Sequence, residues 1–125
     1  MKKSVKYVDG FVLPVPKKKV AQYKRIATLC GKIWREHGAI DYVECMGNDV
    51  PTGKVTSFPK SVKLKKGEVV FFSFATYKSK THRDRVMKKV MNDPRMAKYM
   101  NEETMPFDGM RMFWGGFKPV VSLGS

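Results

Sequence analysis

Two acidic residues lie inside stretches that otherwise have the composition of buried β-strands. Asp9 falls within the run Tyr7–Phe11, and Glu44 falls within the run Ile40–Met46. A buried carboxylate is costly unless it is paired, and burial raises its pKa, as is common for groups that transfer protons. Asp9 and Glu44 are therefore candidate proton acceptors, or anchors for a polar ligand. The alternative is structural: each acid pairs with a nearby base such as Arg111, or lies at a solvated strand end.

A histidine is the third candidate for proton transfer. His82 precedes Arg83 and Asp84 at the expected start of a helix, and an imidazole can exchange a proton near neutral pH. In the competing interpretation, Arg83 and Asp84 contribute to helix capping and form a surface ion pair. The only other histidine, His37, is distant in the sequence, and no Cys/His spacing of a zinc site occurs. The sequence predicts no metal site and no cofactor.

The densest group of distinctive residues lies near the C-terminus. Asp108 and Arg111 precede Trp114, which is followed by two glycines. Glycines allow a backbone to approach a ligand or a partner closely. Arg111 and Trp114 are candidates for placing a substrate, with Asp108 in the same polar network. The alternative is a turn followed by a bulged edge strand at a dimer interface.

The net charge of +14 is unusual for a chain of 125 residues. A positive field of this size attracts polyanions, including nucleic acids. The residues that would contact phosphates lie before the third expected strand and on the second expected helix: Lys63, Lys65, Lys66, Arg83, Arg85, Lys88 and Lys89. However, basic residues are spread along the whole chain, and no RNP, KH or zinc-finger signature accompanies them. Nucleic-acid binding is therefore an alternative that is not favoured over a solvated basic surface.

These side chains must be positioned by four strands and two main helices. Apolar patterns predict strands over about 7–15, 40–46, 68–77 and 110–123, and helices over about 17–37 and after Ser79. Pro94 ends or restarts the second helix, which continues over 95–101. The order strand, helix, strand, strand, helix, strand is the ferredoxin-like split βαβ pattern, an α+β fold with an antiparallel sheet. We expect one domain spanning 1–125, with a long connection or flap at about 47–67.

The strand over 68–77 is apolar on both of its faces. Alternation places Phe71 and Tyr77 on one face, and Phe72 and Phe74 on the other. The two helices can cover only one face of the sheet. A second copy of the chain is the expected cover for the other face, which gives a homodimer in which two sheets form a closed α+β barrel.

The remaining composition bears on the compartment. The sequence has no run of about 20 apolar residues that would span a membrane, and no secretory signal. Cys30 and Cys45 are both expected to be reduced and buried. These features make a cytoplasmic location the default expectation.

Short motifs follow one another in a fixed order from Lys6 to Phe117: Tyr7–Phe11, Val43–Cys45, Asp49–Thr56, His82–Asp84, Met91–Met96, and Met105–Met112 followed by Gly115–Phe117. Together they resemble the YbaA-like family of small bacterial proteins of unknown function. The resemblance implies a dimeric α+β barrel and brings no established reaction with it. Some members carry a label that refers to signal recognition particle RNA. This chain departs from the family in its high positive charge, and in Met46, where the family has a tryptophan after Glu-Cys.

The leading interpretation is an uncharacterised bacterial protein of the dimeric α+β barrel type. Its expected role is to bind a small organic molecule in a pocket between sheet and helices. Folds of this kind can also support catalysis without a cofactor, so a cofactor-independent enzyme remains open by fold analogy. Two alternatives stand beside it: a module that binds RNA or another nucleic acid through its basic surface, and a structural or regulatory dimer without a ligand.

Overall fold

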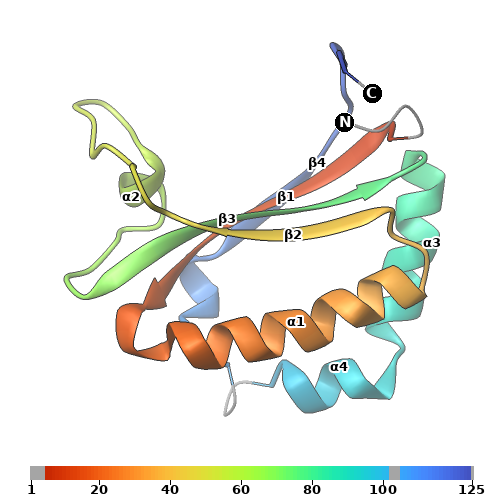
Figure 1. The fold of residues 1–125 in the computed structure, drawn as a ribbon, viewed down its shortest axis with the longest axis horizontal. Coiled ribbons are helices and arrows are strands. Elements are labelled where there is room, and N and C mark those ends of the chain that lie inside the picture. The colour runs from red at the N-terminus through yellow and green to blue at the C-terminus, as the bar shows by residue number, and fades with distance from the viewer. Residues whose placement is uncertain (1–4, 102–104, 125) are drawn as a thin grey trace.

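The computed structural model describes residues 5–101 and 105–124, which form a four-stranded antiparallel sheet with helices on one face (Figure 1). The strands, in the spatial order β2-β3-β1-β4, are β2 (Asp41–Met46), β3 (Glu68–Tyr77), β1 (Tyr7–Pro16) and β4 (Phe113–Phe117). The first and third strands in the chain are therefore central, and the other two lie at the edges. This order confirms the predicted α+β, ferredoxin-like split βαβ arrangement.

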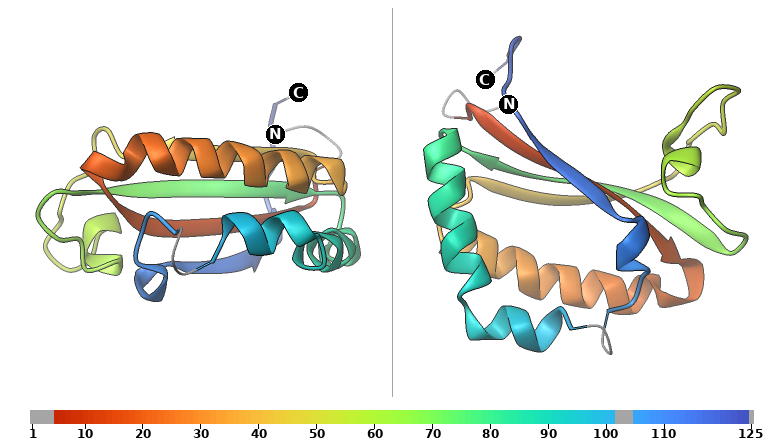
Figure 2. Two further views of the ribbon diagram at one scale, coloured as in Figure 1. Left: turned by 90° about the horizontal axis from the view of Figure 1, so that it is seen from below. Right: turned by 180° about the vertical axis from the view of Figure 1, so that it is seen from behind.

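Three helices lie on one side of this sheet, as the two further views in Figure 2 show. They are α1 (Val20–Glu36), α3 (Lys80–Met91) and α4 (Pro94–Tyr99). The predicted cap of the second main helix is confirmed, because the Ser79 hydroxyl accepts a hydrogen bond from the His82 amide at 3.0 Å. Pro94 begins α4, where its missing N–H costs nothing. Shorter turns occur at η1 (Lys17–Lys19), α2 (Phe58–Ser61) and η2 (Gly109–Arg111).

The core fills the space between the sheet and these helices. Odd-numbered residues of β1 and β3 point toward the helices, as the cross-strand register of Leu13 with Phe71 indicates. The buried stripe of α1 follows the predicted helical spacing, with Ala27, Cys30 and Trp34 all less than 10% exposed. This packing fixes α1 lengthwise against the sheet and thereby positions the site described below.

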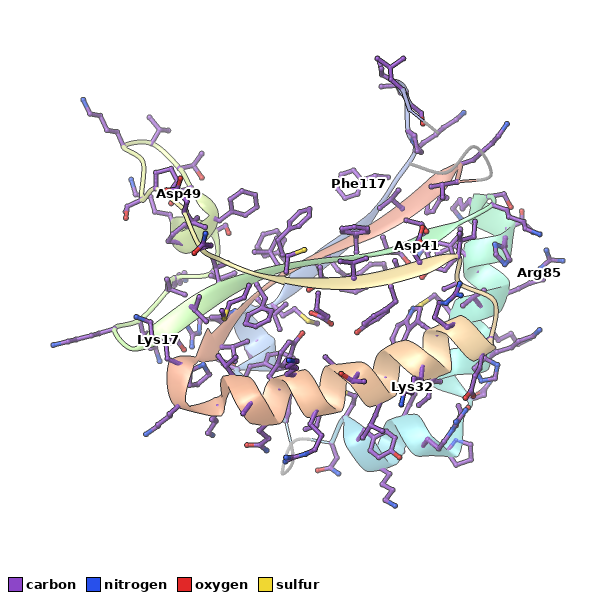
Figure 3. All side chains as sticks on the ribbon, viewed as in Figure 1. Lys17, Lys32, Asp41, Asp49, Arg85 and Phe117 are labelled. Carbon is purple, nitrogen blue, oxygen red and sulfur yellow. The ribbon has the colours of Figure 1, made fainter. Side chains whose placement is uncertain are left out.

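The opposite face of the sheet, which we call the helix-free face because none of α1, α3 and α4 lies on it, includes Val43, Cys45, Phe72, Phe74, Phe113 and Phe117, with Asp41 and its hydrogen-bond partner Thr76 at one end. Phe72 is 44% exposed and Phe117 is 62% exposed; Figure 3 shows Phe117 on the side of the sheet away from α1. At the other end of the sheet, the connection between β2 and β3 packs its buried Val62 against Val12 and Val70. The short helix α2 lies at the same end of this face, where Phe58 meets Phe72 edge-on with ring centroids 5.9 Å apart, and none of the longer helices of the described residues covers the rest.

Two expectations about local structure were wrong. The last strand occupies only Phe113–Phe117 of the expected range 110–123, because a 3₁₀ turn precedes it and Pro119, which lacks a donor, follows it. Cys45 is exposed, whereas Cys30 is buried as expected. Alternation along β2 places Cys45 on the helix-free face, so its apolar neighbours in the sequence do not cover it. None of the helices in the described ranges has the length and apolar character needed to cross a bilayer.

Candidate functional site

Three hydroxyl groups converge on the carboxylate of Glu44, between α1 and the sheet. Glu44 Oε1 accepts a hydrogen bond from Tyr23 at 2.8 Å and another from the Ser73 hydroxyl, and Oε2 accepts one from Tyr42 at 2.7 Å. Hydrogen bonds from donors to a charged acceptor are stronger than those between neutral groups. The acid is therefore held in one orientation by residues from α1, β2 and β3.

The positions of these donors follow from the strand pattern. Tyr42 and Glu44 are alternate residues of β2, so both face α1, and Ser73 lies directly opposite Glu44 on β3. The ring of Tyr42 fits beneath α1 because residue 31 is glycine. A Cβ atom on Gly31 would lie 2.6 Å from Tyr42 Cδ1, which is closer than two such atoms can approach. A glycine inside a helix costs about 1 kcal/mol relative to alanine, and here it makes room for the ring.

Burial and the charge of Glu44 keep its neighbours protonated. Burial, followed by the Glu44 charge, raises the pKa of Tyr23 far above its ordinary value, and the pKa of Tyr42 rises for the same two reasons. The pKa of Cys30 rises to about 11, mainly through burial. Both tyrosines are therefore hydrogen-bond donors throughout the physiological range of pH, and the Cys30 thiol is not an activated nucleophile.

A cavity of about 880 Å³ lies beside this carboxylate, between α1 and β2. Its volume is in the range of small-molecule sites, and its surface is mostly apolar with a few polar groups. Small side chains on α1, at Ala27 and Gly31, leave this space open. The lining residues are Val20, Tyr23, Lys24, Ala27, Thr28, Gly31, Lys32, Arg35, Glu36, Tyr42, Glu44, Met46 and Phe71; Lys32 is labelled on α1 in Figure 3.

The second predicted acid, Asp9, occupies a different position. It is fully buried on β1, and Arg83 Nη1 lies 3.6 Å from its Oδ1. Neither carboxylate oxygen has a hydrogen-bond partner within the described part of the chain. Burial raises the pKa of Asp9, although the Arg83 charge opposes this change. Asp9 is thus a buried acid of raised pKa, but it does not line the cavity beside Glu44.

Arg83 also contacts the rings of Tyr7 and Trp114. The guanidinium carbon lies 5.1 Å from the centre of the Tyr7 ring and 5.8 Å from that of Trp114. Arg83 Nη2 donates a hydrogen bond to the Tyr7 hydroxyl at 3.2 Å. Gly116 lies opposite Asp9 and makes room for Tyr7, since a Cβ atom there would lie 2.3 Å from the tyrosine oxygen. Trp114 is 52% exposed at the edge of this group.

His82 lies outside both the group around Glu44 and the group around Arg83. Its Nδ1 accepts a hydrogen bond from the Lys78 amide at 3.0 Å, and its ring meets Tyr77 edge-on with centroids 6.0 Å apart. Partial burial, and then the charge of Lys78, lowers the pKa of His82. The structure therefore places the three predicted proton-transfer residues in three settings: Glu44 at the cavity, Asp9 beside Arg83, and His82 at the start of α3.

Arg111 and Asp108 lie together but apart from Trp114. Arg111 donates to both carboxylate oxygens of Glu68, at 2.7 and 2.6 Å, and to Asp108 at 2.9 Å. It also donates to the carbonyl oxygens of Val62 and Lys63. These contacts tie the β2–β3 connection to the turn before β4. The hydrogen bonds from Arg111, and to a smaller extent its charge, lower the pKa of Glu68.

The predicted phosphate-contacting residues fall into two separate groups. Lys63, Lys65 and Lys66 are exposed in the turn before β3, whereas Arg85 and its neighbours Lys88 and Lys89 are exposed on α3. The two elements lie at opposite ends of the sheet (Figure 1). The side chain of Arg83 is only 12% exposed and points toward Asp9 rather than outward. Within residues 5–101 and 105–124, no cluster of His, Cys, Asp and Glu could hold a metal ion.

Sequence reasoning missed the partners of Glu44. Tyr23 and Tyr42 are aromatic residues of expected core segments, and Ser73 is a polar residue within a mostly apolar strand. The sequence did contain one signal: Ala27 and Gly31, four residues apart on the core-facing side of the first helix, have a small side chain and none. Small residues at that spacing indicate either that another element approaches the helix closely or that a space is left open. Both occur here, since the Tyr42 ring lies against Gly31 and the cavity lies beside Ala27.

Comparison with known proteins supports the resemblance read from the motifs. The family model described as "Protein of unknown function (DUF1428)" matches residues 6–109. The chain is 46% identical over 117 residues to "Uncharacterized protein YbaA" of Escherichia coli (strain K12), covering 94% of this chain and 98% of YbaA. The Shigella flexneri YbaA has the same identity and coverage. Neither description refers to signal recognition particle RNA.

Among solved structures, the chain is similar to the de novo designed protein Foldit4, with a TM-score of 0.44 and 10% identity, over 94% of this chain and 99% of that one. The sequence matches are far closer and run over almost the whole chain. The YbaA-like resemblance is thus confirmed, and the chain belongs to the DUF1428 family of proteins of unknown function.

Proposed function

We propose that the protein binds a small organic molecule in the cavity between α1 and β2, and that it does so as a homodimer. One observation carries the proposal: a cavity of about 880 Å³ adjoins a carboxylate that three hydroxyl groups hold in place. An apolar hollow with a few fixed polar groups is the usual form of a ligand site. A purely structural role requires neither the hollow nor the oriented acid.

The Glu44 carboxylate has capacity left for a ligand. An ionised carboxylate offers about four lone-pair positions, and three are engaged by Tyr23, Tyr42 and Ser73. A hydroxyl or amino group of a bound molecule can use the remaining one. Because the tyrosines already donate their protons to Glu44, their own oxygens can also accept hydrogen bonds from the ligand.

The proposal is limited to binding. A general acid or base with a raised pKa should face the bound substrate, but Asp9, whose pKa is raised, lies beside Arg83 outside the cavity. Nucleic-acid binding has less support, since the basic residues on α3 and those before β3 lie at opposite ends of the sheet. Glu44 does line the cavity, and the three hydroxyl groups that donate to its carboxylate favour a role in holding a ligand.

The helix-free face supports the homodimer. Apart from Asp41 at one end, which accepts a hydrogen bond from Thr76, its residues are uncharged and largely aromatic, although the chain as a whole carries +14. A partner recognised by charge would not choose this face, whereas a second copy offers an equally uncharged and apolar sheet. Two sheets packed face to face at about 10 Å would bury Phe72 and Phe113 in a closed barrel. The helices, and the cavity beneath α1, would then remain on the outside.

Native mass spectrometry of the protein purified from cells tests the proposal. The wild-type dimer should carry a bound small molecule, seen as added mass that is lost on denaturation. Ala27→Leu places a larger side chain in the cavity and should abolish this added mass. Ala21→Leu makes the same change at an exposed position of α1, outside the cavity, and should leave it unchanged.

Two results would refute the proposal. One is a wild-type protein without added mass under conditions that preserve its dimer. The other is added mass that Ala27→Leu retains fully while circular dichroism shows an unchanged fold. The second result would place the bound molecule elsewhere, and the first would favour a structural or regulatory dimer.

A further inference from the structure

We infer that the cavity selects organic anions: molecules with an apolar body and a carboxylate, sulfonate or phosphate group. The inference rests on the proposed function and adds the chemical class of the ligand. It comes from the charges on the rim of the cavity, which are distinct from the Glu44 group at its inner wall.

The rim is formed by one stripe of α1. Lys24, Thr28 and Lys32 follow one another at intervals of four residues, so they lie on the same side of the helix, and all three line the cavity. Both lysine side chains are exposed, and neither ammonium group has a hydrogen bond or an ion pair to a residue in the described ranges. The Thr28 hydroxyl donates to the Lys24 carbonyl oxygen at 2.7 Å. The part of the chain that the structure describes therefore leaves both ammonium groups at the entrance open to a ligand.

The other charged residues of the lining are already engaged. Arg35 donates hydrogen bonds to the carbonyl oxygens of Ala39, at 3.0 Å, and Ile40. Glu36 forms an ion pair with Arg95 at 2.6 Å on the protein surface. Its negative charge is thus offset by a partner, and the rim keeps the positive charge of the lysines. An anionic group at the entrance meets attraction from both ammonium groups.

The interior fixes which way such a molecule would lie. Val20, Ala27 and Phe71 provide apolar surface for its body. The negative charge of Glu44 at the inner wall disfavours a second anion there and favours a hydrogen-bond donor. The anionic group therefore lies at the rim, and the body lies inward. The ligand class that fits both ends is an organic acid with an apolar body, and a hydroxyl or amino group at the far end adds to the fit.

A pair of fluorescent probes tests this inference. 8-Anilinonaphthalene-1-sulfonate carries a sulfonate, and N-phenyl-1-naphthylamine has the same ring system without it. Each is titrated into the intact protein, into Ala27→Leu, and into two double variants. Lys24→Gln with Lys32→Gln removes the rim charges, and Lys88→Gln with Lys89→Gln removes the same charge from exposed positions on α3. Binding that Ala27→Leu abolishes is binding in the cavity.

The inference predicts that the rim variant weakens cavity binding of the sulfonate probe and leaves the neutral probe within twofold. Exposed ion pairs are each worth a few tenths to about 1 kcal/mol, so the loss for two lysines is roughly 2- to 30-fold. The α3 variant should change neither probe by more than twofold. Both lysine variants should show the circular dichroism spectrum of the intact protein, since the lysines are exposed. The spectrum of Ala27→Leu, at a buried position, shows whether the larger side chain alters the fold.

Three outcomes would overturn the inference, and they point to different causes. Equal losses in the rim and α3 variants would assign the attraction to the overall charge of the protein. If both probes bind in the cavity and the rim variant changes neither affinity, the proposed function stands and the selectivity for anions is refuted. If Ala27→Leu affects neither probe, the cavity holds no ligand, and the proposed function fails together with the inference.

Discussion

Replacing Gly31 by alanine tests how closely α1 and β2 are fitted together. The added methyl group would lie 2.6 Å from Tyr42 Cδ1 and 2.9 Å from Cε1, so the ring must move. Alanine gains about 1 kcal/mol of helix propensity. Against this stand about 1–3 kcal/mol for overpacking and about 1.5–3 kcal/mol for the hydrogen bond from Tyr42 to the charged Glu44. The sum predicts a loss of roughly 1.5–5 kcal/mol in the free energy of unfolding.

Urea denaturation followed by circular dichroism measures this change, at one protein concentration because the protein is proposed to be a dimer. The same substitution in a Tyr42→Ala background provides the control. There the ring is absent, and Gly31→Ala should stabilise the protein by about 1 kcal/mol through helix propensity alone. The sign of the effect should therefore invert between the two backgrounds. If Gly31→Ala stabilises the wild-type protein by about the same amount, Tyr42 does not pack under the helix as described.

Three further predictions concern the helix-free face and the two ion pairs. Phe72→Glu places a charge in the proposed interface and should give monomers in sedimentation at micromolar concentration, while Val55→Glu, at a residue 94% exposed on the connection, should remain dimeric. Burial raises the pKa of Asp9 above 3.8 in the folded protein, so the free energy of unfolding should fall as the pH rises from about 3.8 through the raised pKa. Asp9→Asn has no such proton, and in urea unfolding its stability relative to wild type should increase over the same range of pH. A difference that stays constant with pH would contradict the assignment. Arg111→Met should lower the free energy of unfolding by about 1.5–3 kcal/mol. Because the pKa of Glu68 is lowered in the wild-type protein, wild type should lose stability on acidification below pH 4.5, and the variant should lose less. The same loss in both proteins, measured by urea unfolding at each pH, would show that the pair is not coupled.

The fold could be predicted from the sequence because its signals are local. Alternation along β3 separated Phe71 from Phe72 correctly, and the order of elements led to the split βαβ arrangement, with which the observed sheet order agrees. The error at Cys45 has a simple cause: alternation shows that two faces exist, but it does not say which face of an edge strand the helices cover.

The partners of the charged residues could not be predicted in this way. Arg111 was considered as a base for the buried acids, yet it pairs with Glu68, and Arg83 lies beside Asp9. These pairings depend on where α3 crosses the sheet and on how the β2–β3 connection folds back. Neither leaves a periodic signal in the sequence. The hydroxyl groups around Glu44 likewise come from three elements, and their meeting depends on the register of β2 against β3 and the position of α1.

The central claim is that the cavity under α1 holds a small organic molecule, and a crystal structure of protein taken directly from cells, without added ligand, tests it most directly. We predict continuous electron density, larger than a chain of waters, between α1 and β2, within hydrogen-bond distance of the Glu44 group and extending toward Lys24 or Lys32. A cavity that contains only water, or one that Tyr42 and Met46 close by moving inward, would contradict the claim.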